Sequence, residues 1–265
     1  MKGTGFFLVM GVAAQAALAA NTVLKPIKTG GSEAALIFIE GAEIACSKYI
    51  PLMQQIQNKS DLSLWIGMPA FLGNTPEPVR LSADIHGTIK DMEKEGFDSE
   101  KALLFYGGHS LGTVFIQDYV KENASDATGQ ILTGGFLARK HFSAGENNTF
   151  SYPVPTLTIG GSLDGLARVS RTGAESFYQQ ITLADQAEHF PVAIVQGMTH
   201  QQFASGPAEG LVKQKDLKPE IADDDAHDAA AGVIADFMDK LAGISSAGSI
   251  ITEAVKETSD FLQPI

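Results

Sequence analysis

Two kinds of hydrophobic pattern alternate along this chain. Short apolar runs bounded by glycine, proline or polar turn residues are typical of strands buried on both faces. Between them, apolar residues recur at the three- and four-residue spacing of a helix face. The apolar runs predict strands at 35–40, 62–66, 102–106, 130–137, 156–159 and 191–195.

The helical pattern follows these strands. Its apolar positions are Cys46, Tyr49, Met53 and Ile56, then Ile85, Ile89 and Met92, then Leu111, Val114, Phe115 and Tyr119. Further helices are predicted over 171–183 and 226–241, the second with its N-cap in the acidic run 223–225. The alternation predicts an α/β fold with a mostly parallel central sheet and helices on both faces. In such folds, ligands bind at the carboxyl ends of the strands.

One pentapeptide carries a recognisable chemistry. The run 102–106 leads into Gly108-His109-Ser110-Leu111-Gly112, and a helical pattern follows. Strand, sharp turn and helix form the context of a nucleophile elbow, in which the serine stands above the sheet edge. Gly108 and Gly112 suit a turn that brings the strand and helix backbones together. Ser110 is therefore the predicted nucleophile.

A serine nucleophile needs a base and an acid that orients the base. His200 follows the run 191–195, and of the six histidines it alone comes shortly after the last predicted strand. Asp164 follows the run 156–159 in a glycine-rich loop. A loop aspartate that caps the next helix is an equally ordinary interpretation of Asp164. The order Ser110, Asp164, His200, each after its own strand, favours the catalytic interpretation.

Two backbone N–H groups are predicted to form an oxyanion hole. One belongs to Leu111, directly after the nucleophile, and the other to Ala42, in the loop after the run 35–40. Glu43 would oppose an oxyanion nearby, so its carboxylate is expected to point away to solvent. Cys46 lies in an apolar helical stripe, and we expect it to pack in the core.

The N-terminal segment has the pattern of a secretory signal peptide. A charged start at Met1-Lys2 precedes an apolar run, and Ala17 and Ala19 fit the small-residue cleavage rule. This predicts a signal peptide over 1–19, a secreted or secretory-pathway location, and no stable membrane insertion after cleavage. Residues 20–265 are predicted to form a single α/β domain with a C-terminal helical tail.

The surface charge excludes some partners. The chain of 265 residues has a net charge of −12, which repels nucleic acid. A small-molecule ester is the expected partner, and no cofactor or metal is expected. About twenty residues separate the runs 130–137 and 156–159, which leaves no room for a large lid domain. Whether the loop 201–225 or the tail 243–265 covers the site stays open.

These residues resemble the α/β-hydrolase superfamily over roughly 35–242. Within it the chain is most similar to small esterases of the chlorophyllase and dienelactone-hydrolase type. Three stretches carry this likeness: Ile39-Glu40-Gly41-Ala42 with Tyr49-Ile50-Pro51-Leu52, then Gly108-His109-Ser110-Leu111-Gly112, then 156–165. The resemblance implies Ser110 as nucleophile, Asp164 as acid and His200 as base. Leu111 stands where chlorophyllases typically have arginine, which argues against chlorophyll as the substrate.

The prediction is a serine carboxylic-ester hydrolase that works through an acyl-enzyme intermediate. Two alternatives remain. One is a lipase-like or chlorophyllase-like hydrolase of long apolar esters. The other is a hydrolase-fold binding protein without catalysis, since a fold does not fix a function.

Overall fold

The fold is known from a computed structural model that describes residues 20–141, 152–182 and 187–263. The predicted signal peptide, 1–19, lies outside the described residues. So does Leu183, the predicted end of one helix. Among the described residues, no helix has the length and apolar character needed to cross a membrane.

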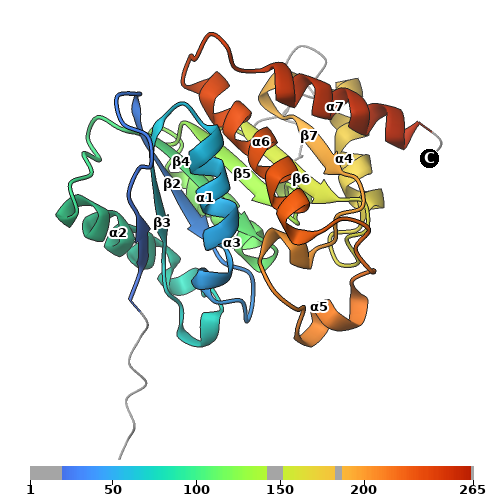
Figure 1. Ribbon diagram of the computed structural model, residues 1–265, viewed down its shortest axis with the longest axis horizontal. Helices are drawn as coiled ribbons and strands as arrows, with labels where there is room; N and C mark the ends of the chain where they lie inside the picture. The colour runs from blue at the N-terminus through green and yellow to red at the C-terminus, as the bar shows by residue number, and fades with distance from the viewer. Residues whose placement is uncertain (1–19, 142–151, 183–186, 264–265) are drawn as a thin grey trace, which may run out of the picture.

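Among the described residues, seven strands form one mostly parallel sheet (Figure 1). The sheet order is β1-β3-β2-β4-β5-β6-β7, and only β1 runs antiparallel to its neighbour. The strands are β1 (Thr22–Leu24), β2 (Glu33–Ile39), β3 (Ser63–Met68), β4 (Leu103–His109), β5 (Gly129–Thr133), β6 (Thr156–Gly161) and β7 (Val192–Val195). The predicted fold class is confirmed.

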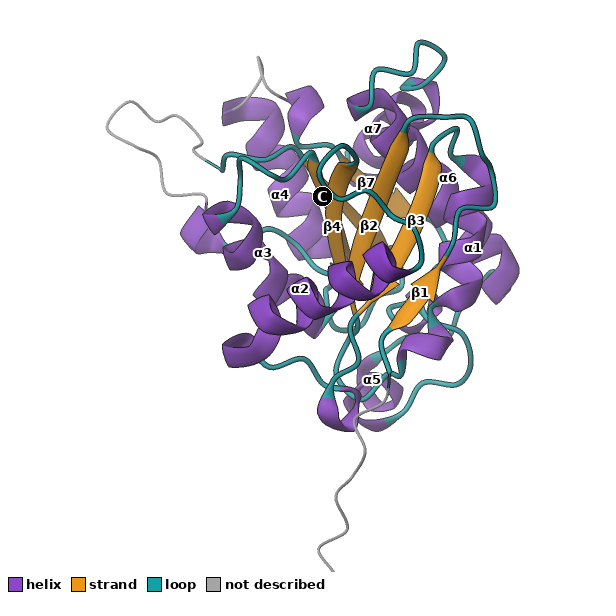
Figure 2. Ribbon diagram, turned by 90° about the vertical axis from the view of Figure 1, so that its left-hand side faces the viewer, coloured by secondary structure: helices purple, strands orange, loops and turns teal. Residues whose placement is uncertain are grey.

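Helices cover both faces of this sheet (Figure 2). On one face lie α1 (Ile50–Lys59), α6 (Asp223–Leu241) and α7 (Ser249–Leu262). On the other lie α2 (Pro78–Lys94), α3 (Leu111–Glu122) and α4 (Val169–Thr182). The short helix α5 (Gly210–Lys215) belongs to neither layer and lies at one end of the molecule (Figure 1). The described residues form no large lid domain.

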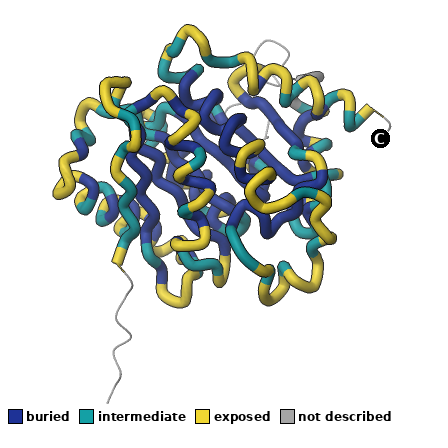
Figure 3. Tube along the Cα trace, in the orientation of Figure 1, coloured by how far each residue is buried: buried dark blue, intermediate teal, exposed yellow. Residues whose placement is uncertain are grey.

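Strand β2 shows why the apolar runs are continuous. Ala34, Leu36 and Phe38 pack into the core beneath α1 and α6, whereas Ala35, Ile37 and Ile39 pack into the core beneath α2 and α3. Successive side chains of a strand point to opposite faces, so a strand covered on both sides must be apolar throughout. Figure 3 shows the resulting buried sheet inside an exposed shell.

Several predicted boundaries were wrong. Strand β2 ends at Ile39, so Glu40 belongs to the following loop. The run 130–137 holds a strand only as far as Thr133, because Gly134 adopts a φ of 55° and turns the chain away. Helix α6 begins at Asp223 after an N-cap at Ala222. The acidic run therefore occupies the first turn, where carboxylates favour the helix dipole.

Two elements were not predicted as such. Strand β1 is a three-residue antiparallel edge strand, too short to give a periodic signal. Helix α5 lies inside the segment predicted only as a loop. Five short 3₁₀ turns also occur among the described residues, at Cys46–Lys48, Leu72–Asn74, Arg139–His141, Ala187–His189 and Gln201–Phe203.

Candidate active site

Ser110 lies at the sharp turn between β4 and α3. Its backbone adopts φ 52° and ψ −117°, a strained conformation for a residue with a side chain. A Cβ atom on Gly112 would lie 2.4 Å from the carbonyl oxygen of Ile39, and one on Gly108 would lie 2.8 Å from the Gly112 backbone. The two glycines thus permit the close approach that this turn requires. Ser110 itself remains partly exposed.

His200 and Asp164 meet in the loops that follow β7 and β6. The Nδ1 atom of His200 lies 2.7 Å from Oδ2 of Asp164, and both side chains are buried. The other carboxylate oxygen, Oδ1, accepts the backbone N–H groups of Leu166 and Ala167, each at 2.7 Å. Asp164 is therefore the partner of His200 and caps the turn at 165–168, but it does not cap the next helix, α4, which begins at Val169.

This arrangement fixes the tautomer of His200. A carboxylate only accepts hydrogen bonds, so the Nδ1 atom of His200 carries the proton. The Nε2 atom is then the acceptor in the neutral ring. It is buried and has no hydrogen-bond partner among the described residues. A serine nucleophile requires a base, and the His200 ring, held in the tautomer with an acceptor Nε2, can serve as that base.

The elbow and the loop that carries His200 are in direct contact. His109, which precedes Ser110, lies with its ring centroid 4.6 Å from that of His200. Its Nε2 atom is 3.1 Å from the backbone oxygen of His200. The structure thus gathers Ser110, Asp164 and His200 at the carboxyl ends of β4, β6 and β7.

The predicted oxyanion donors also border this cluster. A Cβ atom on Gly41 would lie 3.3 Å from Cβ of Ser110, so the loop that carries Ala42 packs against the elbow. Leu111 is the first residue of α3. Neither the Ala42 nor the Leu111 N–H donates a hydrogen bond to another described backbone or side-chain group. Both N–H groups are therefore unused as donors within the described part of the chain. The N–H of Leu111 also lies at the N-terminus of α3, the positive end of the helix dipole.

Glu43 is exposed, as expected. Its backbone N–H donates to Oγ1 of Thr75 at 3.1 Å. Its carboxylate faces α5, because a Cβ atom on Gly210 would lie 3.0 Å from Oε2 of Glu43. The loop after β2 is therefore flanked by two other segments, 69–78 and 204–216.

A buried polar pair lies beneath this loop, and sequence reasoning missed it. Sγ of Cys46 lies 3.0 Å from Oε2 of Glu40, which is 1% exposed. Burial raises the pKa of Glu40 to about 7. Burial, with the nearby Glu40 charge as a smaller cause, raises the pKa of the Cys46 thiol. Cys46 is thus a protonated hydrogen-bond donor as well as a core residue.

Asp216 is a second residue that sequence reasoning missed. Its carboxylate accepts three backbone N–H groups: Gly165 at 3.0 Å, His200 at 3.1 Å and Gln201 at 2.9 Å. It therefore ties the loop of Asp164 to the loop of His200. Nothing in the local sequence distinguishes it from the other charged residues of the segment 201–225.

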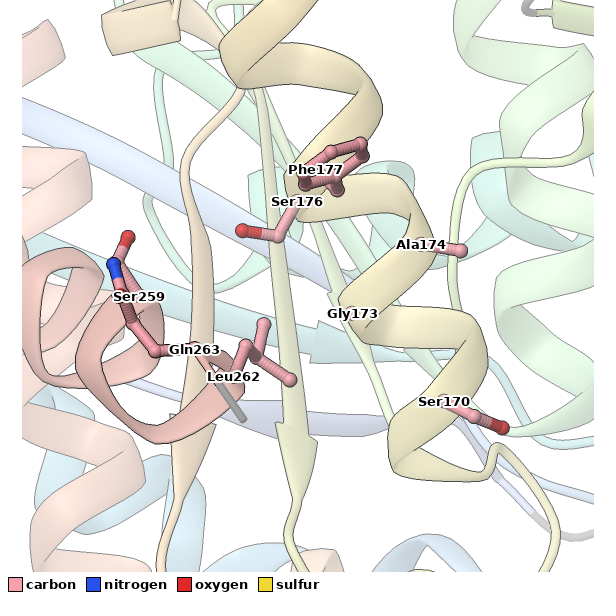
Figure 4. A pocket seen from close by; sticks show the side chains of 8 residues that line it. All are labelled: Ser170, Gly173, Ala174, Ser176, Phe177, Ser259, Leu262 and Gln263. Carbon is pink, nitrogen blue, oxygen red and sulfur yellow. The ribbon is translucent and has the colours of Figure 1, made fainter. Parts of the chain in front are cut away.

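A separate cavity of about 520 Å³ lies between α4 and α7 (Figure 4). Its walls mix apolar side chains with serine hydroxyls and one amide, and Leu262 points from α7 toward α4 (Figure 4). None of Ser110, Asp164 or His200 lines it, and the described residues that do line it include no titratable side chain: Ser170, Gly173, Ala174, Ser176, Phe177, Ser259, Leu262 and Gln263. Elsewhere, the described residues contain no group of three or more His, Cys, Asp or Glu side chains suited to a metal ion.

No protein-family model matches the chain, and no curated protein sequence does. Solved structures do match it. A highly thermostable carboxyl esterase from Bacillus coagulans, in complex with glycerol, is 11% identical with a TM-score of 0.54, covering 83% of this chain and 93% of that one. Est1E from Butyrivibrio proteoclasticus is 10% identical with a TM-score of 0.52, covering 84% and 94%.

A third structure, a phospholipase/carboxylesterase from Dyadobacter fermentans, is 17% identical over 68% of this chain and 88% of that one. Its TM-score of 0.44 is too low to support an argument. At these identities the likeness establishes the fold: the chain has the α/β-hydrolase fold. The narrower resemblance to chlorophyllases and dienelactone hydrolases stays a prediction.

Proposed function

We propose that this protein is a serine carboxylic-ester hydrolase in which Ser110, His200 and Asp164 form the catalytic triad. One observation carries the proposal: the buried His200–Asp164 pair with its free Nε2 lies in contact with an elbow whose serine is held in a strained turn. The carboxyl esterase from Bacillus coagulans has the same fold, which adds support by analogy.

The proposed reaction begins with attack on the ester. Nε2 of His200 takes the proton of the Ser110 hydroxyl while Oγ bonds to the carbonyl carbon. The carbonyl oxygen becomes an oxyanion and accepts the N–H groups of Ala42 and Leu111. The imidazolium of His200, stabilised by Asp164, then gives its proton to the leaving alcohol as the C–O bond breaks.

Water completes the cycle. His200 removes a proton from a water molecule, which attacks the acyl carbon of the acylated Ser110. The second tetrahedral intermediate collapses, Ser110 regains its proton from His200, and the acid leaves. Every proton in this scheme moves between Ser110, His200, the substrate and water.

A series of p-nitrophenyl esters from acetate to palmitate tests the proposal. The wild type should release p-nitrophenol, and Ser110→Ala should reduce the rate to near the background of the assay. A fluorophosphonate probe should label the wild type at Ser110 and leave the variant unlabelled. If the wild type hydrolyses no ester and takes no label, the alternative of a non-catalytic binding protein is correct.

A specific observation favours long apolar esters as a second candidate function. Leu72, Val79, Leu211 and Leu217 are between 56% and 94% exposed. They lie in or next to the two segments that flank Glu43, one through Thr75 and the other through Gly210. If they hold an acyl chain, the ester series should peak at long chains, and Leu211→Ser should lower the rate for palmitate more than for acetate.

We also propose that the protein is secreted after removal of residues 1–19. The pattern of the N-terminal segment is the support. The intact mass of protein recovered from a secreting host tests it. A mature chain that begins at Ala20 or a neighbouring residue is expected, and an intracellular protein that keeps Met1 would contradict it.

A further inference from the structure

Three buried hydrogen bonds join the loop after β2, the elbow and the loop of His200. The N–H of Gly41 donates to the hydroxyl of Tyr49 at 2.8 Å. That hydroxyl lies 2.9 Å from Nδ1 of His109. Nε2 of His109 lies 3.1 Å from the backbone oxygen of His200. The side chains of Tyr49 and His109 are completely buried.

The direction of each of these three hydrogen bonds is determined. A carbonyl oxygen only accepts, so Nε2 of His109 donates to His200. Burial, and the nearby His200 as a smaller cause, lower the pKa of His109 well below its usual value, so the ring is neutral. Nδ1 of His109 is then an acceptor and Tyr49 donates to it. The Tyr49 oxygen in turn accepts the Gly41 N–H.

This series of hydrogen bonds connects three segments that the proposed reaction uses together. Gly41 precedes Ala42, a proposed oxyanion donor, and His109 precedes the proposed nucleophile Ser110. A Cβ atom on Gly41 would lie 3.1 Å from Nδ1 of His109 and 3.2 Å from the Tyr49 hydroxyl. At the other end, His109 supports the ring of His200 at a centroid distance of 4.6 Å. Tyr49 comes from the start of α1, so this helix anchors all three segments.

We propose that Tyr49 and His109 are positioning residues: their aligned hydrogen bonds set the oxyanion loop and the catalytic histidine loop in register with Ser110. This inference rests on the proposed hydrolase function. Neither side chain forms a hydrogen bond with Oγ of Ser110 or with Nε2 of His200. Their contribution is to hold donors and base where the transition state needs them, and small displacements there reduce turnover strongly.

A purely structural role would have a different signature. Loss of a buried hydroxyl that leaves polar partners unpaired destabilises any protein. Such a loss lowers the unfolding temperature without a selective change in kcat. A positioning role lowers kcat while KM stays nearly constant, because the interaction matters most in the transition state.

The test compares Tyr49→Phe with Tyr152→Phe. The Tyr152 hydroxyl is also buried and lies 2.8 Å from both the backbone oxygen of Gln117 and Oε1 of Gln130, away from the site. Both variants should lose similar thermal stability. Tyr49→Phe should lose about tenfold or more in kcat with KM within about twofold of wild type, whereas Tyr152→Phe should keep its kcat. Equal kcat in the two variants would overturn the proposal.

Two His109 variants test the other end, and they serve also if Tyr49→Phe does not fold. His109→Gln places an amide donor near the position of Nε2, so it should retain more of the kcat than His109→Ala. No difference between the two would count against the bond to His200. In the wild type at neutral pH, nitrogen-15 NMR should show His109 as the neutral Nε2–H tautomer. A proton on Nδ1 would overturn the arrangement.

The outcomes separate this inference from the proposed function. A wild type without hydrolysis or fluorophosphonate labelling refutes the function, and the positioning role falls with it. A wild type that hydrolyses esters through Ser110, together with a Tyr49→Phe variant that matches its control, refutes the positioning role alone.

Discussion

Oδ2 of Asp164 lies 2.7 Å from Nδ1 of His200, while its Oδ1 accepts two backbone N–H groups from the residues just after it. The carboxylate is therefore fixed by its own loop before it meets the imidazole. A rigid acceptor of this kind selects one tautomer of the histidine. The lone pair of Nε2 is left free for a proton from the nucleophile.

We expect Asp164→Asn to reduce kcat by roughly 10³- to 10⁴-fold. The asparagine oxygen can keep the two backbone bonds, so its amide would donate to Nδ1 of His200 and select the tautomer with a proton on Nε2. Ester hydrolysis measures the effect. Asp236→Asn is the matched control, because Asp236 is buried and also accepts two backbone N–H groups, those of Gly248 and Ile251. A kcat within tenfold of wild type would remove Asp164 from the triad.

Asp216→Ala should disorder the loops that carry the acid and the base. The change leaves the N–H groups of Gly165, His200 and Gln201 without their acceptor. Each lost bond to a charged group costs on the order of 1 kcal/mol or more. Hydrogen exchange should accelerate at the His200 and Gln201 amides, and kcat/KM should fall. Unchanged protection of both amides would show that Asp216 does not hold these loops.

Two glycine-to-alanine substitutions, one at the elbow and one in α2, should change the free energy of unfolding in opposite directions. Gly112→Ala should destabilise the fold by about 2 kcal/mol or more, because its Cβ would lie 2.4 Å from backbone oxygen of Ile39. Gly87→Ala is the control, since Gly87 lies in α2 and a Cβ there would meet nothing within 4 Å. Alanine in a helix interior is favoured by about 0.5–1 kcal/mol over glycine. Urea denaturation measures both, and a stable Gly112→Ala variant would contradict the packing described at the elbow.

The raised pKa of Glu40 should make the protein less stable as the pH rises. Its pKa is raised from 4.5 when unfolded to about 7 in the folded protein, chiefly by burial. The folded state therefore holds this proton more tightly, so its contribution is fully present below pH 4.5 and is lost as the pH rises toward 7. The shift corresponds to roughly 3 kcal/mol.

Glu40→Gln tests this pH dependence directly. An amide can accept the Cys46 thiol through its oxygen and place its NH₂ group where the carboxyl proton would be. The variant should match the wild type at a pH below 4.5 and exceed it in free energy of unfolding at pH 8. Burial also raises the pKa of Glu175, to about 8. Glu175 is present in both proteins, so its contribution to the pH dependence cancels when the two stability curves are compared. Parallel stability curves for the two proteins would show that Glu40 does not titrate in this range.

Much of the candidate site could be predicted because its signals are local. Ser110 is flanked within a few residues by the strand and helix patterns that create its turn, and Asp164 and His200 each come shortly after an apolar run. Parallel strands bring their carboxyl ends to one edge of the sheet, so residues after different strands gather there. Boundaries were less predictable, as with Gly134, because one positive φ ends a strand inside an apolar run.

The contacts that support the site could not be predicted. Tyr49 and His109 are 60 residues apart in the chain, and Asp216 is 51 residues from Gly165. Tyr49 has the spacing of a core residue, and its hydroxyl gains a role only where α1 meets the elbow. Glu40 lies at a strand end like many surface carboxylates, yet packing buries it beside Cys46.

The sequence by itself determined the alternation of strands and helices, the elbow at Ser110 and the chain order of the three candidate catalytic residues, because each follows from short-range periodicity and turn chemistry. Only the tertiary structure decided which polar groups pair in the interior. A buried donor or acceptor must find a partner wherever packing places it, and that partner comes from whichever distant segment the fold brings alongside.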